Sequence, residues 1–267
     1  MKDFLEKLSE VPCTAGSRLC IGLDPEPSRL PASYRNEGAQ GMAAFCLEVA
    51  RITAPFARAF KLNLAFFEAL GWEGYRAMEQ VIKGLPETHI VIADGKRGDI
   101  GNTSRRYADA MYDVLGVDAC TVNPYMGSEA IAPFLSEASR AAFVLTATSN
   151  PSAAAIQDAQ IGGKPFYLHV ARTVEESASP LPGTLGFVVG ATRPDALALM
   201  AREFPGRPLL VPGVGAQGAS MRDVARALTG MPALINVGRS ILYASSGEDF
   251  GEAAARAAEE LAIESIG

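Results

Sequence analysis

The sequence predicts an α/β fold, a single (β/α)8 TIM barrel that spans residues 1–267. Short apolar runs rich in β-formers alternate with helical patterns, and eight such runs occur along the chain. The length of 267 residues and the hydrophobic content of 48% are ordinary for one barrel of this kind. No linker rich in Ser, Gly or Pro divides the chain, so we expect one domain.

Each element follows from its local pattern. Residues 1–12 combine alternating charges with Phe4, Leu5 and Leu8, which predicts a short amphipathic helix. After the third strand, Tyr107 and Met111 keep a helical spacing behind a cap region at 102–104. The runs that predict strands cover residues 19–24, 56–62, 89–94, 117–122, 141–147, 186–191, 208–213 and 233–238.

Two connections are longer than a compact barrel requires. They cover residues 25–41 and 149–165, and each follows a predicted strand. Loops of this length at the carboxyl end of a barrel are often lids or binding loops, although surface insertions are about as common. We expect the second to be a lid.

Composition excludes several classes of function. The formal charge of −6 and the lack of a dense Lys/Arg block argue against a nucleic-acid surface. No apolar stretch is long enough to span a bilayer, and the N-terminus does not resemble a signal peptide, so we expect a cytoplasmic protein. The four cysteines are scattered and predict free thiols. His89 and His169 are the only histidines, which excludes a His-rich metal site and argues against a Ser/His/Asp triad.

Charged residues gather where the third predicted strand ends. Asp94, Lys96 and Asp99 follow the apolar run HIVIA, and strand alternation would place Asp94 and Lys96 on one face. Lys61 ends the second predicted strand and points to the same rim. These four residues would form an alternating array with no net charge, in which Lys96 is a fixed cation and proton donor. A purely structural ion-pair network is the alternative interpretation.

Glycine-rich turns follow the seventh and eighth predicted strands. Residues 211–218 (VPGVGAQG) and 236–242 (NVGRSIL) occupy the positions at which barrels of this class bind phosphate. Glycines allow the backbone to approach a ligand, while Gln217 and Arg239 offer donors. The alternative is that these glycines serve only tight turns. Two such turns at the expected positions, one of them carrying Arg239, favour a phosphate site.

These motifs together resemble the orotidine 5'-phosphate decarboxylase family, in its bacterial branch with longer loops. The most specific element is D-x-K-x-x-D-I-x-x-T, formed here by Asp94, Lys96, Asp99, Ile100 and Thr103. The resemblance extends from about residue 19 to residue 241. The other matching motifs, in family order, are GLDP at 22–25, FKLN at 60–63, VNPYMG at 122–127, TSNP at 148–151, VVGAT at 188–192, PGVGAQG at 212–218 and NVGRSI at 236–241.

The resemblance implies cofactor-free conversion of orotidine 5'-monophosphate to uridine 5'-monophosphate and CO2, in pyrimidine biosynthesis. Asp94 would lie against the substrate carboxylate, and Lys96 would protonate C6 as CO2 leaves. Lys61 would complete the charged array. The implied substrate contacts are Asp24 at the ribose, Ser149 at the pyrimidine, and Gln217, Gly238 and Arg239 at the phosphate, with Pro212 also in the substrate site.

The resemblance also implies a homodimer, in which Asp99, Ile100 and Thr103 reach the neighbouring subunit's site. Two other functions remain as alternatives. A magnesium-dependent sugar-phosphate decarboxylase or aldolase of the same superfamily would need a further acidic ligand near the second strand, for which Glu68 is the candidate. A non-catalytic barrel that binds a nucleotide phosphate would have no use for the proton donor Lys96.

Overall fold

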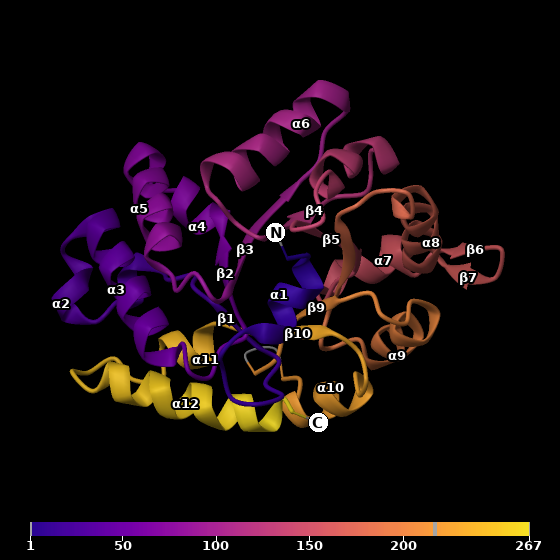
Figure 1. Cartoon of the computed structure of the whole chain (residues 1–267). Coiled ribbons are helices and arrows are strands. Elements are labelled where there is room, and N and C mark those ends of the chain that lie inside the picture. The colour runs from indigo at the N-terminus through magenta and orange to yellow at the C-terminus, as the bar shows by residue number, and fades with distance from the viewer. Residues whose placement is uncertain (1, 216–217, 267) are drawn as a thin grey trace.

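The computed structural model describes residues 2–215 and 218–266. Within these residues, eight parallel strands close a barrel in the order β1-β10-β9-β8-β5-β4-β3-β2, which confirms the predicted fold class. Figure 1 shows the helices around this barrel. The barrel strands are β1 (Leu19–Gly22), β2 (Ala59–Asn63), β3 (Ile90–Arg97), β4 (Ala119–Val122), β5 (Ala141–Ala147), β8 (Thr184–Val189), β9 (Leu209–Pro212) and β10 (Ala233–Val237).

The longer helices lie outside the barrel, and shorter helical segments occupy its connections. The α-helices are α1 (Phe4–Glu10), α2 (Ala32–Arg35), α3 (Gly38–Thr53), α4 (Leu64–Glu68), α5 (Gly71–Gly84), α6 (Gly101–Asp109), α7 (Ala154–Gln157), α8 (Phe166–Ala178), α9 (Pro194–Glu203), α10 (Met221–Ala227), α11 (Arg239–Leu242) and α12 (Phe250–Glu264). Single turns of 3₁₀ helix cover Pro27–Arg29, Ser128–Ala130, Ala132–Leu135 and Pro151–Ala153. None of the helices in the described part of the chain has the length and apolar character to cross a membrane.

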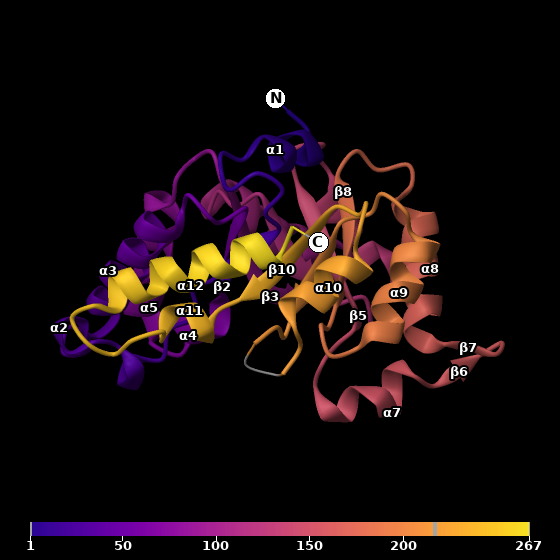
Figure 2. The same ribbon diagram turned by 90° about the horizontal axis from the view of Figure 1, so that it is seen from below.

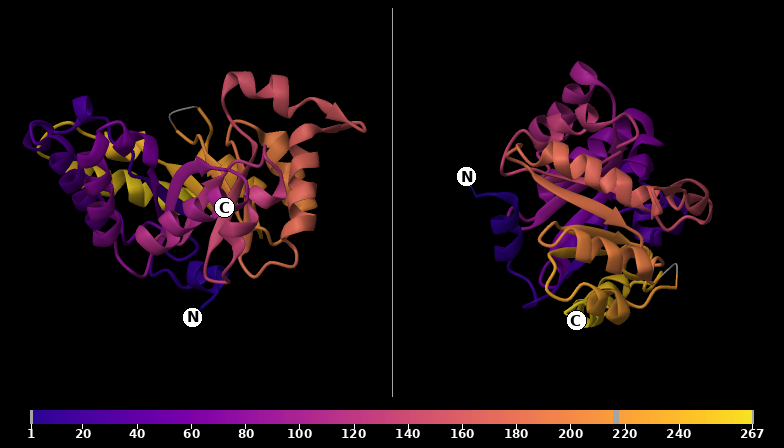
Figure 3. Two further views of the ribbon diagram at one scale, coloured as in Figure 1. Left: turned by 90° about the horizontal axis from the view of Figure 1, so that it is seen from above. Right: turned by 90° about the vertical axis from the view of Figure 1, so that its right-hand side faces the viewer.

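The N-terminal helix α1 closes one end of the barrel. Its Asp3 forms a capping box with Glu6, in which the Glu6 amide donates to Asp3 Oδ1 at 2.8 Å. Phe4 and Leu8 pack with the inward-facing residues of the barrel, and the Phe4 and Phe143 rings meet edge to face. Figures 2 and 3 show α1 at one end and α7 with the small β6–β7 hairpin (Gln160–Ile161 and Lys164–Pro165) at the other.

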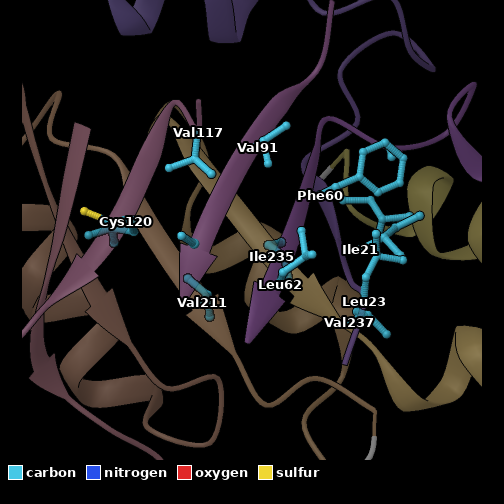
Figure 4. Packing of buried hydrophobic residues seen from close by; sticks show 14 of the residues in the cluster. Ile21, Leu23, Phe60, Leu62, Val91, Val117, Cys120, Val211, Ile235 and Val237 are labelled. Carbon is cyan, nitrogen blue, oxygen red and sulfur yellow. The ribbon is translucent and has the colours of Figure 1, made fainter. Parts of the chain in front are cut away.

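The main hydrophobic core lies between the barrel and its surrounding helices. Phe60, Val91 and Ile235 point outward from their strands into this layer, as the close-up in Figure 4 shows. Their sequence neighbours Ala59, Ile90 and Leu234 belong to the separate cluster inside the barrel. This alternation between an outer layer and an inner cluster explains why the strands appear in the sequence as nearly continuous apolar runs.

Three local expectations differ from the structure. The helix after β3 begins at Gly101, so 102–104 lie inside it and do not cap it, and its end is a π-helical turn at Ala110–Val114. The connection at 25–41 contains Pro27–Arg29, α2 and the start of α3. The connection at 149–165 likewise contains α7 and the β6–β7 hairpin.

The histidines have different environments. His89 precedes β3, is 4% exposed, and its ring nitrogens lie 3.0 Å from the Ala54 carbonyl and 3.1 Å from Thr88 Oγ1. His169 is exposed on α8 and stacks on Phe166. His89 therefore has a structural role at the end of the barrel that α1 closes.

Candidate active site

Polar residues occupy the inward-facing positions at the carboxyl ends of the strands. Inside the barrel, Ala59, Ile92 and Ala119 belong to the buried apolar cluster. Two residues further along each strand the side chain faces the same way, and the apolar residue is replaced by a polar one. The resulting group at the barrel mouth is Lys61, Asp94 and Thr121.

A network of alternating charge lies at the barrel mouth and consists, in order, of Asp24, Lys61, Asp94 and Lys96. Lys61 Nζ lies 3.2 Å from Asp24 Oδ2 and 3.1 Å from Asp94 Oδ2. Lys96 Nζ lies 2.7 Å from Asp94 Oδ1. The Lys61 side chain is 4% exposed, whereas that of Lys96 is 48% exposed. The formal charges cancel, so the network is buried without an uncompensated charge, and Lys96 is its accessible end.

The network fixes the protonation states of its buried members. Burial alone would raise the pKa of the Asp94 carboxyl, but the Lys61 and Lys96 ammonium groups outweigh burial and hold that pKa well below its usual range. Burial would likewise lower the pKa of Lys61, but Asp24 and Asp94 outweigh it and raise that pKa above its ordinary value. Asp94 is therefore a carboxylate and Lys61 an ammonium at neutral pH.

The backbone that carries Lys96 is not the regular strand from which we predicted its contact with Asp94. The pairing of β3 with β4 shifts register between Ala93 and Arg97, and Lys96 has a φ of 47°. Lys96 and Asp94 meet as predicted, but the regular strand alternation from which we predicted it is interrupted at this irregularity. Gly95 passes close to α4, where an added Cβ would lie 2.9 Å from Leu64 Cδ2. The ion pair between Lys96 and Asp94 thus lies at the irregular end of β3.

Asp99 does not belong to the charged network of its own chain. Its carboxylate accepts a hydrogen bond from the Ile100 amide at 2.8 Å, and it forms no ion pair within the part of the chain that the structure describes. The expected array of Lys61, Asp94, Lys96 and Asp99 therefore needs correction, because Asp24 supplies the fourth charge. The chain turns away after the irregular end of β3 and carries Asp99 to the start of α6.

A cavity of about 360 Å³ opens beside this network. Pro212, Gly238 and Arg239, all predicted to bind substrate, lie on its wall together with charged members of the network. The complete lining is Asp24, Glu26, Lys61, Asn63, Phe66, Asp94, Pro212, Gly213, Val214, Asn236, Gly238, Arg239 and Leu242. A cation on a glycine-bordered wall and a charged array in the same cavity can hold an anionic ligand by both of its ends.

The backbone approaches itself closely where β1 and β10 end. A Cβ added to Gly238 would lie 3.3 Å from the Gly22 carbonyl oxygen, and one added to Gly22 would lie 3.4 Å from Asp24 Oδ2. Asp24 is held by a hydrogen bond from the Asn63 amide to Oδ1 at 2.6 Å. The lack of side chains at both glycines leaves room for Asp24 and for the cavity.

Of the predicted site residues that the structure describes, five do not line the cavity: Lys96, Asp99, Ile100, Thr103 and Ser149. Ile100 is 52% exposed, and Thr103 is exposed on the first turn of α6. Ser149 follows β5 and packs against Gly190, where an added Cβ would lie 2.8 Å from the Ser149 amide nitrogen. Gln217 lies outside the described residues.

Several cavity residues were missed by sequence reasoning. Asn63 lies two residues beyond the inward-facing Lys61 and Asn236 two residues beyond the inward-facing Leu234, so the alternation that located Lys61 also pointed to them. Thr121 could have been found in the same way, since it is a polar residue inside an apolar strand. Glu26 and Phe66 come from irregular or helical segments, for which no such signal exists.

Glu68, the candidate metal ligand of the alternative function, is already paired. Its carboxylate forms an ion pair with Arg97 and accepts a hydrogen bond from the Tyr75 hydroxyl at 3.2 Å. Over residues 2–215 and 218–266, no group of three or more His, Cys, Asp or Glu side chains is placed to hold a metal. Glu68 therefore serves to anchor Arg97, the residue that follows Lys96.

Comparisons with known proteins agree over nearly the whole chain. The model of the orotidine 5'-phosphate decarboxylase / HUMPS family matches residues 17–256. The chain is 43% identical to an orotidine 5'-phosphate decarboxylase of Roseiflexus castenholzii, with 97% of this chain and 96% of the relative covered. It is 41% identical to that of Herpetosiphon aurantiacus, with 97% of both covered.

Solved structures give the same result. An OMP decarboxylase of Leishmania donovani superposes with a TM-score of 0.82 at 33% identity, covering 100% of both chains. The UMP synthase of Leishmania donovani gives a TM-score of 0.85 at 36% identity, where 98% of this chain corresponds to 56% of that protein. The chain belongs to the orotidine 5'-phosphate decarboxylase family.

Proposed function

We propose that the protein converts orotidine 5'-monophosphate to uridine 5'-monophosphate and CO2. The observation that carries this proposal is the Asp24–Lys61–Asp94–Lys96 network beside a cavity with Arg239 in its wall. Two relatives that are more than 40% identical over 97% of the chain have names that state this decarboxylase activity.

The substrate's two anionic groups suit the two sides of the cavity. Its phosphate would bind Arg239 and the Gly238 amide, with Gln217 as a further donor and Pro212 in the adjoining wall. Its pyrimidine carboxylate would then lie toward Asp94 and Lys96, the ribose hydroxyls toward Asp24, and the ring within reach of Ser149.

The reaction breaks the bond between C6 and the carboxylate carbon. CO2 leaves, and the electron pair stays at C6 in an sp² orbital that the ring π system does not delocalise. Lys96 donates a proton from Nζ to C6, which completes the product, and solvent then reprotonates the amine. A fixed ammonium stabilises this localised charge more than the delocalised carboxylate that precedes it, so the transition state is bound more tightly than the substrate.

Repulsion between Asp94 and the substrate carboxylate contributes less than the whole effect. Two unit charges about 4 Å apart interact by about 4 kcal/mol at an effective dielectric constant of about 20. Complete relief of this energy would accelerate the reaction by about three powers of ten. Binding energy from the remote phosphate, which would close the connection at 149–165 over the site and exclude water, supplies a further part.

A homodimer would complete the site. Lys96 is half exposed, while Asp99, Ile100 and Thr103 project from the start of α6 without a partner in the charged network. A second copy that brings Asp99 to Lys96 would place the ammonium between two carboxylates. The four free cysteines fit the reducing cytoplasm, where we place the reaction.

Mixing two inactive variants tests the shared site. Lys96→Ala and Asp99→Ala homodimers are both expected to be nearly inactive. If subunits exchange at random, about a quarter of all sites in the mixture combine an intact Lys96 with an intact Asp99. Recovery of about a quarter of the wild-type activity would support the shared site, and no recovery despite exchange would contradict it.

The activity itself is tested by following the loss of orotate absorbance, and the formation of uridine 5'-monophosphate, in the presence of a chelator. We expect turnover that the chelator does not reduce. Turnover only after magnesium is restored would support the sugar-phosphate alternative, and binding of the nucleotide without turnover would support a non-catalytic barrel.

A further inference from the structure

The hydroxyl of Thr121 joins Asp94 and Lys96, two neighbouring members of the charged network. Thr121 lies on β4 with 1% of its surface exposed, and it faces the barrel interior beyond Ala119. Its Oγ1 donates to Asp94 Oδ1 at 2.7 Å and accepts from the Lys96 backbone amide at 2.9 Å. One side chain thus connects the carboxylate of Asp94 with the main chain of Lys96.

The hydrogen bonds around Asp94 divide between its two oxygens. Oδ2 accepts from Lys61 Nζ, and Oδ1 accepts from both Lys96 Nζ and the Thr121 hydroxyl. The hydroxyl therefore restricts rotation of the carboxylate about its axis, and this rotation would separate Oδ1 from Lys96 Nζ.

The backbone of Lys96 needs such a partner. Its φ of 47° is unfavourable for any residue other than glycine, and the regular pairing of β3 with β4 is interrupted there. The Lys96 amide donates to the Thr121 hydroxyl at 2.9 Å, which gives this part of the backbone a fixed partner on β4. The side chain of Lys96 is half exposed, and its Nζ pairs with the same Asp94 oxygen that the Thr121 hydroxyl contacts.

We propose that Thr121 is a positioning residue for decarboxylation, whose hydroxyl holds the Asp94 carboxylate and the Lys96 backbone in the one arrangement that presents Nζ to the substrate. This inference rests on the proposed function. Thr121 supplies no proton to the reaction and carries no charge. Its effect is exerted through Lys96 and Asp94, so it should change turnover and leave the phosphate end of the site intact.

Substitutions of Thr121 separate the hydroxyl from the size of the side chain. Thr121→Val keeps the shape and removes both hydrogen bonds, and we expect kcat to fall by about 10- to 100-fold, as for small displacements of a reacting group. The inhibition constant of uridine 5'-monophosphate should stay within about twofold of wild type, because Arg239 and its neighbours are unchanged. Thr121→Ser restores the hydroxyl and should recover most of kcat.

Thr146→Val is the matched control. Thr146 is 3% exposed on the neighbouring strand β5, and its hydroxyl donates to the Val188 carbonyl at 2.8 Å without touching the charged network. We expect this variant to lose stability much as Thr121→Val does while keeping kcat. Equal losses of kcat in the two valine variants, or a full kcat in Thr121→Val, would overturn the proposal.

A structural measurement keeps the inference independent of activity. In a crystal structure of Thr121→Val, we expect the Lys96 φ to leave the left-handed region, or Lys96 Nζ to leave Asp94. An unchanged conformation and ion pair would overturn the positioning role. Absence of turnover in the wild type, by contrast, would contradict the proposed function. The crystal structure of Thr121→Val would then still test whether Thr121 positions Lys96 and Asp94.

Discussion

Lys61→Met removes the cation that separates two carboxylates. Lys61 Nζ lies 3.2 Å from Asp24 and 3.1 Å from Asp94, and its side chain is 4% exposed. Two unit charges at about this distance attract by about 5 kcal/mol at an effective dielectric constant of about 20. Loss of the ammonium also relieves its desolvation, so the expected fall in the free energy of unfolding is about 3–5 kcal/mol, as measured for broken buried ion pairs.

The loss of stability in Lys61→Met should depend on pH. In the wild type the pKa of Asp94 is depressed, so its contribution to stability is complete above the unfolded value of about 3.9 and is lost as the pH falls toward the folded pKa. Without Lys61 that pKa rises, and Asp94 takes up a proton at a higher pH. The difference between the two proteins should therefore be largest near pH 7 and smaller near pH 4.

Urea unfolding at these two pH values measures the effect directly. Lys83→Met is the control, because Lys83 pairs with Glu79 on the surface with a side chain that is 64% exposed. It should leave the free energy of unfolding unchanged. Equal stability of the Lys61 and Lys83 variants, or a loss in Lys61→Met that is independent of pH, would refute the electrostatic reasoning.

Two further variants test other parts of the molecule. Arg239→Ala removes the cation from the cavity wall. We expect kcat/KM to fall about 10- to 100-fold, which corresponds to the loss of one charge-assisted hydrogen bond to phosphate. An unchanged kcat/KM in steady-state assays would contradict the phosphate role of Arg239. Burial and the charge of Lys7 lower the pKa of His89, although its hydrogen bond to the Ala54 carbonyl opposes them. The unfolded state therefore binds a proton at His89 more readily than the folded state does. Wild-type stability should consequently fall as the pH drops below about 6.5. In His89→Gln, the melting temperature should differ less between pH 5 and pH 7.5 than it does in the wild type. Equal differences in the two proteins would contradict this prediction.

The sequence was sufficient for most of the fold because the barrel strands are buried on both sides. Their apolar runs stand out between amphipathic helices, and the predicted ends agree with the structure to within three residues. The largest differences are the start of β2, at Ala59 and not residue 56, and the end of β3, at Arg97 and not residue 94. The connections were harder to predict. Residues 25–41 and 149–165 form short helices and a hairpin, whose local packing has no strong periodicity.

The site was predictable where strand alternation applies. Lys61 and Asp94 follow inward-facing apolar residues, and the structure brings them together as expected. Alternation failed after Asp94, because the bulge at the end of β3 sets the direction of Lys96 and Asp99 by backbone geometry that residue types do not encode. Strand alternation places Thr121 at an inward-facing position, but its role depends on two hydrogen bonds that only the folded structure reveals.

The central claim is that Lys96 stabilises and protonates the carbanion formed at C6. The most direct test compares kcat for wild type and Lys96→Ala in the orotate absorbance assay, with the inhibition constant of uridine 5'-monophosphate and the melting temperature showing that the variant is folded and binds nucleotide. We expect kcat to fall by at least about 10²- to 10⁴-fold, the usual contribution of a positioned proton donor, while nucleotide binding persists. A folded Lys96→Ala variant with a kcat close to that of wild type would contradict the account.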